Sequence, residues 1–266
     1  MDVNAFGLSD QGRVRVNNED ALLLEEGLGL FVVADGMGGH RGGEVASAMA
    51  TKVLRDAIAS SSAGNGAFLG TVDQRYSREA NLLASGVRLA NRAIFEAARS
   101  NQAWQGMGTT VDAVLLQGGR AGIAHVGDSR VYLMRGGSLR QITDDHSLVA
   151  EQVRQGTLTA EEARVSTRKN VITRALGQWE ELEVDMVDLE LADNDRLLLC
   201  SDGLTGMVDD AGIAELLGMH QNPEAACRAL VEAANANGGR DNVTVVLLAF
   251  QEQRGFVAGL KKMFLR

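Results

Sequence analysis

The sequence has few of the residues that mark disulfide-bonded or multidomain proteins. Its 266 residues include 2 cysteines and 1 proline. Cys200, in an apolar run, and Cys227, in a helix-like segment, are expected to be buried thiols and not a disulfide, because free cysteine is usually buried. The single proline, Pro223, and the lack of long low-complexity tracts give no sign of an interdomain linker. With 45% hydrophobic residues, one large domain is expected.

Two further absences bound the function. No window approaches the roughly 18 uninterrupted apolar residues that a membrane-spanning helix needs. Residues 1–10 have neither the basic start nor the apolar core of a secretory signal. The net charge is −9, and the body of the chain has no basic patch, which argues against a broad nucleic-acid-binding face. The expectation is a cytoplasmic protein with no transmembrane segment and no nucleic-acid partner.

Acidic residues, by contrast, occur at the ends of strand-like runs. Asp35, Asp128 and Asp202 each follow an apolar run, and Asp241 lies just before one. Glycines beside Asp35 and Asp128 allow backbone carbonyls and another molecule to come close. Four carboxylates at strand ends, far apart in sequence, point to convergence on one site for a hard cation.

The hydrophobic pattern predicts two groups of strands with two long helices between them. Strands are predicted at 3–8, 21–24, 28–34, 109–116, 120–126, 131–134, 139–142, 182–191, 195–200 and 243–250. Helices are predicted at 44–60, 75–99, 209–218 and 223–235, with a hairpin turn at 25–27. Glycine pairs at 118–119 and 136–137 are typical of tight turns in an antiparallel meander. The pattern therefore favours two antiparallel sheets packed face to face with helices outside.

Six short motifs follow one another along the chain. They are Arg15-Val16-Asn17-Asn18-Glu19-Asp20, Asp35-Gly36-Met37-Gly38-Gly39, Gly106-Met107-Gly108-Thr109-Thr110, Val126-Gly127-Asp128-Ser129-Arg130, Cys200-Ser201-Asp202-Gly203-Leu204 and Arg240-Asp241-Asn242-Val243-Thr244. In this order they resemble the metal-dependent serine/threonine protein phosphatases of type 2C, in their bacterial form. The resemblance covers roughly residues 3–250. It implies an α+β fold, an α-β-β-α sandwich of two antiparallel sheets flanked by helix pairs, over residues 1–250.

The same resemblance implies a centre for Mn²⁺ or Mg²⁺ with two core ions. Asp35 would bridge both ions, and the Gly36 carbonyl would bind one of them. Asp202 and Asp241 would hold the other core ion. Asp128, together with Asp202, would hold an additional, weaker ion.

The resemblance assigns further residues to support and substrate binding. Glu19 would lie on the second ion's side, with Asp20 and Asn242 in supporting positions. Arg15 would bind the substrate phosphate, since its planar fork can grip two phosphoryl oxygens. With Asp35 and Asp202, it would complete the set of catalytic residues.

The source of the proton for the leaving group stays open. Animal members carry histidine directly after the Asp-Gly pair, but this sequence has Met37 there, and a thioether cannot donate a proton. The proton would then come from His40, a metal-bound water or solvent. Residues 145–170 are polar and locally helical, and they resemble the family's flap.

The implied function is hydrolysis of phosphoserine and phosphothreonine in proteins by direct attack of a water that bridges two divalent metals. The substrates would be phosphorylated proteins, themselves products of a serine/threonine kinase. The alternative is a non-catalytic phosphatase-like domain that binds or senses a partner, but such a domain should have lost one of the matched acids. Residues 251–266 form a basic amphipathic tail. The tail is expected either to dock on the protein's own body or to bind a partner or an anionic membrane surface. Of the last two, a protein partner is favoured, because five apolar side chains are few for stable membrane attachment.

Overall fold

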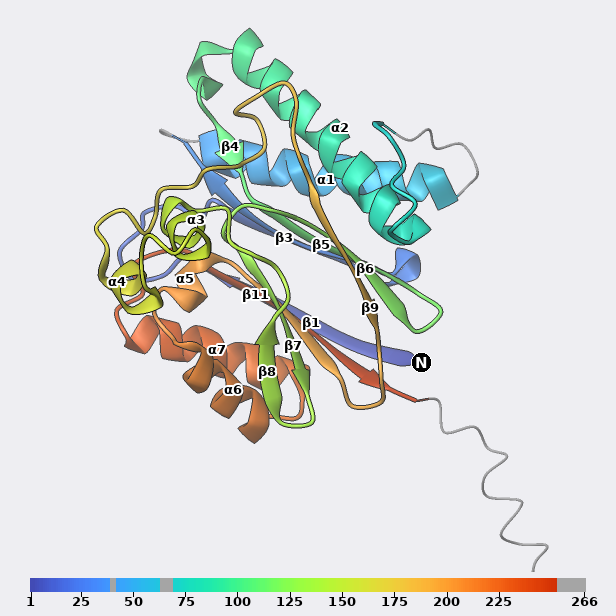
Figure 1. Ribbon diagram of the computed structural model, residues 1–266, viewed down its shortest axis with the longest axis vertical. Coiled ribbons are helices and arrows are strands. Elements are labelled where there is room, and N and C mark those ends of the chain that lie inside the picture. Colours follow the sequence, from blue (N-terminus) through green and yellow to red (C-terminus); the bar gives the residue numbers. More distant parts are fainter. Residues whose placement is uncertain (39–41, 63–68, 253–266) are drawn as a thin grey trace, which may run out of the picture.

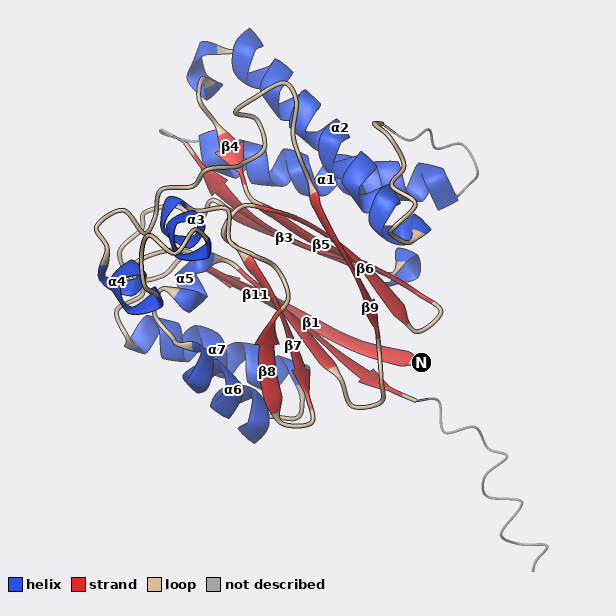
Figure 2. Ribbon diagram, viewed as in Figure 1, coloured by secondary structure: helices blue, strands red, loops and turns tan. Residues whose placement is uncertain are grey.

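The computed structural model describes residues 1–38, 42–62 and 69–252, in which two antiparallel sheets face each other (Figures 1 and 2). One sheet has the strand order β1-β11-β10-β7-β8, and the other has the order β2-β3-β5-β6-β9, with β4 paired to β3. The strands of the first sheet are β1 (Asp2–Asp10), β7 (Arg130–Arg135), β8 (Ser138–Gln141), β10 (Arg196–Cys200) and β11 (Val243–Gln251). Those of the second are β2 (Asp20–Glu25), β3 (Leu30–Met37), β4 (Gly108–Thr109), β5 (Val111–Gln117), β6 (Arg120–Val126) and β9 (Asp185–Glu190).

Helices cover the outer face of each sheet (Figure 2). The long helices α1 (Gly42–Ser62) and α2 (Arg78–Ser100) pack on the second sheet, and α6 (Asp210–Met219) and α7 (Pro223–Ala236) pack on the first. The short helices are α3 (Leu148–Arg154), α4 (Ala160–Val165), α5 (Asp202–Thr205), η1 (Glu26–Leu28) and η2 (Gln102–Trp104). The predicted α-β-β-α sandwich is therefore confirmed. Among the described helices, none combines the length and the apolar character of a membrane-spanning segment.

The central strands are apolar on both faces because each sheet is covered on both sides. In β3, Phe31 and Val33 point into the core between the sheets, whereas Leu30 and Val32 point toward α1 and α2. The same alternation divides β11 between the inter-sheet core and the core under α6 and α7. Successive side chains of a strand point to opposite faces, so an uninterrupted apolar run fills two cores. The ends of these strands are thereby held in fixed positions.

The structure differs from the prediction mainly at element boundaries. The second long helix begins at Arg78 and not at 75, because the Ser77 side chain caps it by accepting a hydrogen bond from Ala80 N. The predicted hairpin at 25–27 is confirmed, since β2 pairs antiparallel with β3, but its turn is the short helix η1, followed by Gly29 with φ 67°. Helix α5 was not predicted. Strand β11 continues to Gln251, which pairs with Asp2, one residue into the segment assigned to the tail. Of that tail, residues 253–266 lie outside the described residues.

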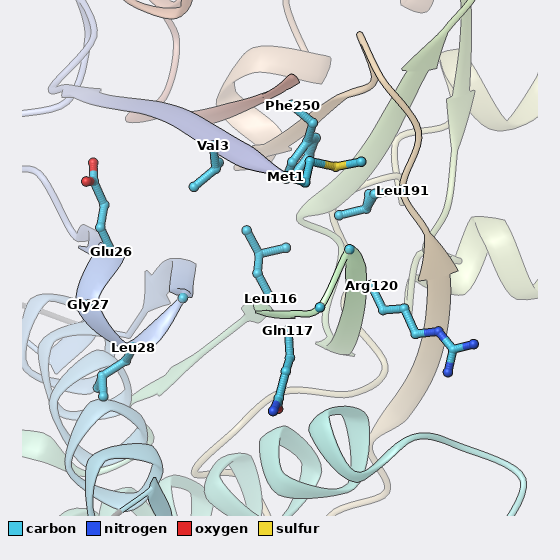
Figure 3. Close-up of a pocket in the computed structure, with 13 residues that line it drawn as sticks. Met1, Val3, Glu26, Gly27, Leu28, Leu116, Gln117, Arg120, Leu191 and Phe250 are labelled. Atoms are coloured by element: carbon cyan, nitrogen blue, oxygen red, sulfur yellow. The ribbon is translucent and has the colours of Figure 1, made fainter. Parts of the chain in front are cut away.

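The two ends of the sandwich differ in character. At the end where β1 begins and β11 finishes, a cavity of about 330 Å³ opens between the sheets (Figure 3). Its apolar lining includes Val3, Leu116 and Phe250. The acidic residues selected from the sequence lie at the opposite end of the same strands.

Candidate metal centre

Strand pairing brings the selected acids to one end of the sandwich. Asp20 on β2 is directly opposite Asp35 on β3. Asp202 lies two residues after the end of β10, and Asp241 lies two residues before the start of its antiparallel neighbour β11. Asp128 lies in the turn between β6 and β7, and β7 in turn pairs with β10. Five carboxylates from five separate segments therefore meet where the two sheets end.

The backbone around Asp35 is fixed by hydroxyl groups and by the absence of a side chain at Gly36. Asp35 N donates to Thr110 Oγ1 (3.0 Å), and its carbonyl accepts from Thr109 Oγ1 (2.9 Å) and Thr110 N (2.8 Å). A Cβ on Gly36 would lie 2.2 Å from Gly43 O and 2.4 Å from Glu19 O, so no other residue fits. Gly36 thus lets β3, the loop before β2 and the start of α1 approach one another closely.

Asn242 holds the loop that carries Arg15 and Glu19. This side chain is buried, and its Oδ1 accepts from Glu19 N (2.9 Å). Its Nδ2 donates to Gln11 O (2.9 Å) and Asn17 O (2.8 Å). The side-chain amide of Asn242, the neighbour of Asp241, therefore binds both ends of the 11–19 loop.

Ser201 and Asp20 connect the two sheets next to the acids. Ser201 Oγ donates to Asp20 Oδ2 (2.9 Å) and accepts from Thr244 N (3.0 Å). The sequence motifs predicted a role for Asp20 but none for Ser201 or Thr110. The Thr110 hydroxyl is hydrogen-bonded to that of Ser129 (2.7 Å). Ser201 and Thr110 lay within the recognised motifs, but their partners depend on contacts between distant strands.

Arg15 is the cation at the rim of the cluster. Its Nη2 donates to Asp241 Oδ2 at 2.6 Å, and about half of its side chain is exposed. Partial burial by itself would lower the pKa of Arg15. The hydrogen bond and charge of Asp241, together with the charges of Asp35 and Glu19, outweigh burial and raise that pKa. A permanently charged guanidinium thus faces the acids from the solvent side.

The acids repel one another strongly, as their pKa values indicate. Burial, followed by the charges of Asp20, Asp202, Asp128 and Asp241, raises the pKa of Asp35 well above its ordinary value. Burial and the Asp241 charge raise the pKa of Asp202 to about 6. Burial and the charges of Asp202 and Asp145 raise the pKa of Asp128 to about 7. Burial, opposed by hydrogen bonds from Thr244 and Ser201, raises the pKa of Asp20 to about 6, and burial also raises that of Glu19.

These residues fit hard divalent cations. Asp20 Oδ1 and Asp128 Oδ1 are buried and accept no hydrogen bond from the described part of the chain. Unpaired carboxylate oxygens in a mutually repelling cluster are stabilised by bound cations. Within the described ranges, no three His, Cys, Asp or Glu side chains are already spaced to hold one ion by themselves. Mg²⁺-like ions commonly take only one or two carboxylates and keep several waters, so the donor set suits them.

The histidines lie outside this cluster or outside the described residues. His40, the candidate general acid, lies outside the described residues. His125 is a hydrogen-bonded sheet residue: its Nδ1 is 2.7 Å from Asp112 Oδ1, and its Nε2 is 3.0 Å from Asp144 O. His146 contacts the turn that carries Asp128. Cys200 and Cys227 are free buried thiols, as predicted.

Comparison with known proteins agrees with this geometry. The family model described as "Protein phosphatase 2C" matches residues 12–242. The serine/threonine phosphatase stp of Listeria welshimeri is 39% identical over 243 residues, which cover 90% of this chain and 93% of that protein. The serine/threonine phosphatase PstP/Ppp of Mycobacterium tuberculosis is similar in structure, with a TM-score of 0.83 and 37% identity over 94% of this chain and 99% of that one.

A further solved structure bears on the metal. The catalytic domain of the serine/threonine protein phosphatase PstP, determined in complex with 2 manganese ions, has a TM-score of 0.81 and 37% identity, and the match covers 94% of this chain and 99% of that one. The fold, the order of the motifs and the convergence of the acids thus indicate the same family as the sequence similarity, which extends over nearly the whole chain. This chain belongs to the protein phosphatase 2C family.

Proposed function

We propose that this protein is a metal-dependent protein phosphatase that hydrolyses phosphoserine and phosphothreonine. The observation that carries the proposal is the convergence of Asp35, Asp128, Asp202 and Asp241 at one end of the sandwich, with Arg15 at the rim. The related phosphatases are named as serine/threonine enzymes, which supports the same substrate class for this chain. Natural substrates would be phosphoproteins made by a serine/threonine kinase. The cytoplasmic location stays a prediction.

Each acid has a distinct proposed role. Asp35 would bridge two core ions of Mn²⁺ or Mg²⁺, with the Gly36 carbonyl on one ion and Asp202 and Asp241 on the other. When bound, such a pair supplies an activated water as nucleophile and neutralises the phosphoryl oxygens. The protein's part is to hold the carboxylates in place, which the hydrogen bonds of Thr110 to Asp35 support.

Glu19, Asp20 and Asn242 would support the core, and Asp128 would hold the additional ion. Asn242 fixes the Glu19 backbone, and Ser201 fixes Asp20. Asp128 Oδ1 is buried without a hydrogen-bond partner among the described residues, as expected for an oxygen that binds a cation.

Arg15 would bind and orient the phosphate of the substrate. In the structure its guanidinium is paired with Asp241, yet the side chain is half exposed and so remains accessible to an incoming dianion. Two of its N–H groups could bind two phosphoryl oxygens and orient the phosphorus toward the nucleophile. The proton for the leaving serine or threonine oxygen would come from His40, a metal-bound water or solvent.

The non-catalytic alternative is disfavoured because the full set of matched acids is present. The carboxylates of the cluster repel one another, and this repulsion destabilises the fold. A domain that only senses a partner would have no need to keep them. Metal-dependent release of phosphate from an aryl phosphate separates the two functions, since a sensing domain would release none.

Residues 251–266 have two proposed roles, although 253–266 lie outside the described residues. Apolar residues Phe256, Val257, Leu260, Met263 and Phe264 recur at helical spacing, and the segment is basic whereas the whole chain carries a net charge of −9. The favoured role is docking on the protein's own acidic body. The other role is docking to a protein partner.

The first prediction concerns Asp35→Asn and Asp202→Asn. Each removes one charge from a site that must hold dications, so aryl-phosphate turnover should fall by on the order of a hundredfold or more. Steady-state kinetics at saturating Mn²⁺ measures this. Turnover within tenfold of wild type, roughly 1.4 kcal/mol in barrier, would contradict the assignment.

Stability of the metal-free protein gives the same prediction a second readout. The pKa of Asp35 is higher in the folded state than in the unfolded chain, where it is near 4. Asp35 therefore does not destabilise the fold below about pH 4, and it lowers the free energy of unfolding as the pH rises from there through its folded-state pKa. Without metal at pH 8, Asp35→Asn should therefore melt higher than wild type. Adding Mn²⁺ should raise the melting temperature of wild type more than that of the variant. A lower melting temperature for the metal-free variant at pH 8 would contradict mutual repulsion.

The second prediction concerns Arg15→Ala. It should lower kcat/KM roughly thirtyfold, which corresponds to a loss of about 2 kcal/mol in transition-state stabilisation, if the guanidinium makes a charge-assisted contact with phosphate. Arg15→Lys is the matched control, because it keeps the charge but loses the planar fork, and it should recover only part of the loss. Mn²⁺ affinity, measured by calorimetry, should change little. Unaltered kinetics in Arg15→Ala would show that the residue is not involved in phosphate binding.

The third prediction concerns the tail. Ending the chain after Glu252 preserves the β1–β11 pairing, which extends to Gln251. If the tail docks on the protein's own body, the melting temperature should fall by several degrees. If it binds a partner, melting and aryl-phosphate turnover should stay unchanged while copurification of that partner is lost.

A further inference from the structure

The turn that carries Asp128 is held by a residue far along the chain. His146 N donates to Gly127 O at 2.7 Å, and Gly127 N donates to His146 Nδ1 at 3.0 Å. Both backbone groups of the residue before Asp128 are therefore satisfied by His146. At the other end of the turn, Arg130 donates to both carboxylate oxygens of Asp145, the neighbour of His146.

Only glycine fits at the first position of this turn. Gly127 has φ 120°, which side chains rarely allow, and a Cβ there would lie 2.5 Å from Thr110 Cβ. Asp128 Oδ1 is buried and has no hydrogen-bond partner among the described residues. The direction of that oxygen is thus set by the turn, since no neighbouring group holds it in place.

The contacts of His146 select one form of its ring. The side chain is 4% exposed, and because Nδ1 accepts from Gly127 N–H, that nitrogen carries no proton. The proton of the neutral ring is then on Nε2, which lies 3.2 Å from Asp185 Oδ2. Arg174 Nη1 is 3.1 Å from the same ring nitrogen, but a guanidinium only donates, and its hydrogen bond goes to Asp185 Oδ1 (2.6 Å). Asp185 therefore holds the ring in the form that can accept from Gly127.

We propose that His146, held in this form by Asp185, is a positioning residue for Asp128 and sets the affinity of the additional ion. The inference rests on the proposed role of Asp128 as a ligand. The Asp185 carboxylate accepts from Nε2–H, Nδ1 accepts from Gly127 N–H, and the Gly127 backbone directs Asp128. Groups that hold a metal ligand in place commonly change metal affinity by about 10–100-fold when they are removed.

Two substitutions separate the two nitrogens of the ring. His146→Asn places an amide oxygen near the position of Nδ1, so it can still accept from Gly127 N–H but cannot reach Asp185. His146→Gln places an amide N–H near Nε2, so it can donate to Asp185 but loses the acceptor for Gly127. Asp185→Asn is a third variant at a partly exposed site. Its amide can donate to Nε2 and so move the ring proton to Nδ1, where it opposes the Gly127 contact.

The experiment is titration of the full chain with Mn²⁺ by calorimetry, with thermal denaturation as the folding control. His146→Gln and Asp185→Asn should weaken the additional site by about tenfold or more, whereas His146→Asn should stay within about threefold of wild type. Binding to the core pair should be unchanged in all three. Wild-type affinity in both His146→Gln and Asp185→Asn would overturn the proposal. Equal losses in His146→Asn and His146→Gln would also overturn it, because the acceptor would then not be the feature that matters.

Asp128→Ala distinguishes failure of this inference from failure of the proposed function. If it abolishes the weak binding phase while His146→Gln leaves that phase intact, only the positioning role is wrong. If it leaves the whole titration unchanged, Asp128 is not a ligand, and the inference falls together with that assignment.

Discussion

Mutual repulsion among carboxylates at one end of the sandwich is the constraint on which the rest of the structure depends. Asp20, Asp35, Asp128 and Asp202 have raised pKa values, and charges of the same cluster contribute to each shift. Such a cluster opposes folding unless cations neutralise it or the scaffold is stable enough to tolerate it. The metal-dependent family to which the chain belongs gives the physical reason for this arrangement, since dications convert the repulsion into attraction.

The scaffold tolerates this charge because most of the acids lie at the ends of strands with buried middles, namely β3, β6, β10 and β11. Three apolar layers, one between the sheets and one beneath each helix pair, fix the strands. Small polar groups then orient the strand ends: Thr110 at Asp35, Ser201 at Asp20, Asn242 at Glu19 and His146 beside Asp128. These four positions are thus held by neutral hydrogen-bond partners, which add no charge to the cluster, whereas the Asp241 carboxylate is paired with the charged Arg15.

The sequence predicted the fold and the convergence of the acids because both depend on local patterns, and the roles of the acids as metal ligands stay predictions. Apolar runs that end in Asp with glycine marked the ends of β3 and the β6–β7 turn, and helical spacing marked α1, α2, α6 and α7. Helix α5, four residues long, was missed because so short a segment has no periodicity. Ser201, Thr110 and His146 could not be assigned their roles, because a hydroxyl or imidazole acquires its partner only when strands distant in sequence come together. The general acid stays open, since His40 lies outside the described residues.

Anomalous diffraction from crystals of the full chain grown with Mn²⁺ tests the central claim most directly. The account predicts two strong manganese peaks roughly 3.5–4 Å apart, with the Asp35 carboxylate between them, and a weaker third peak beside Asp128. Contradiction would be a single peak remote from Asp35, or no peak among the acids at manganese concentrations that support full activity.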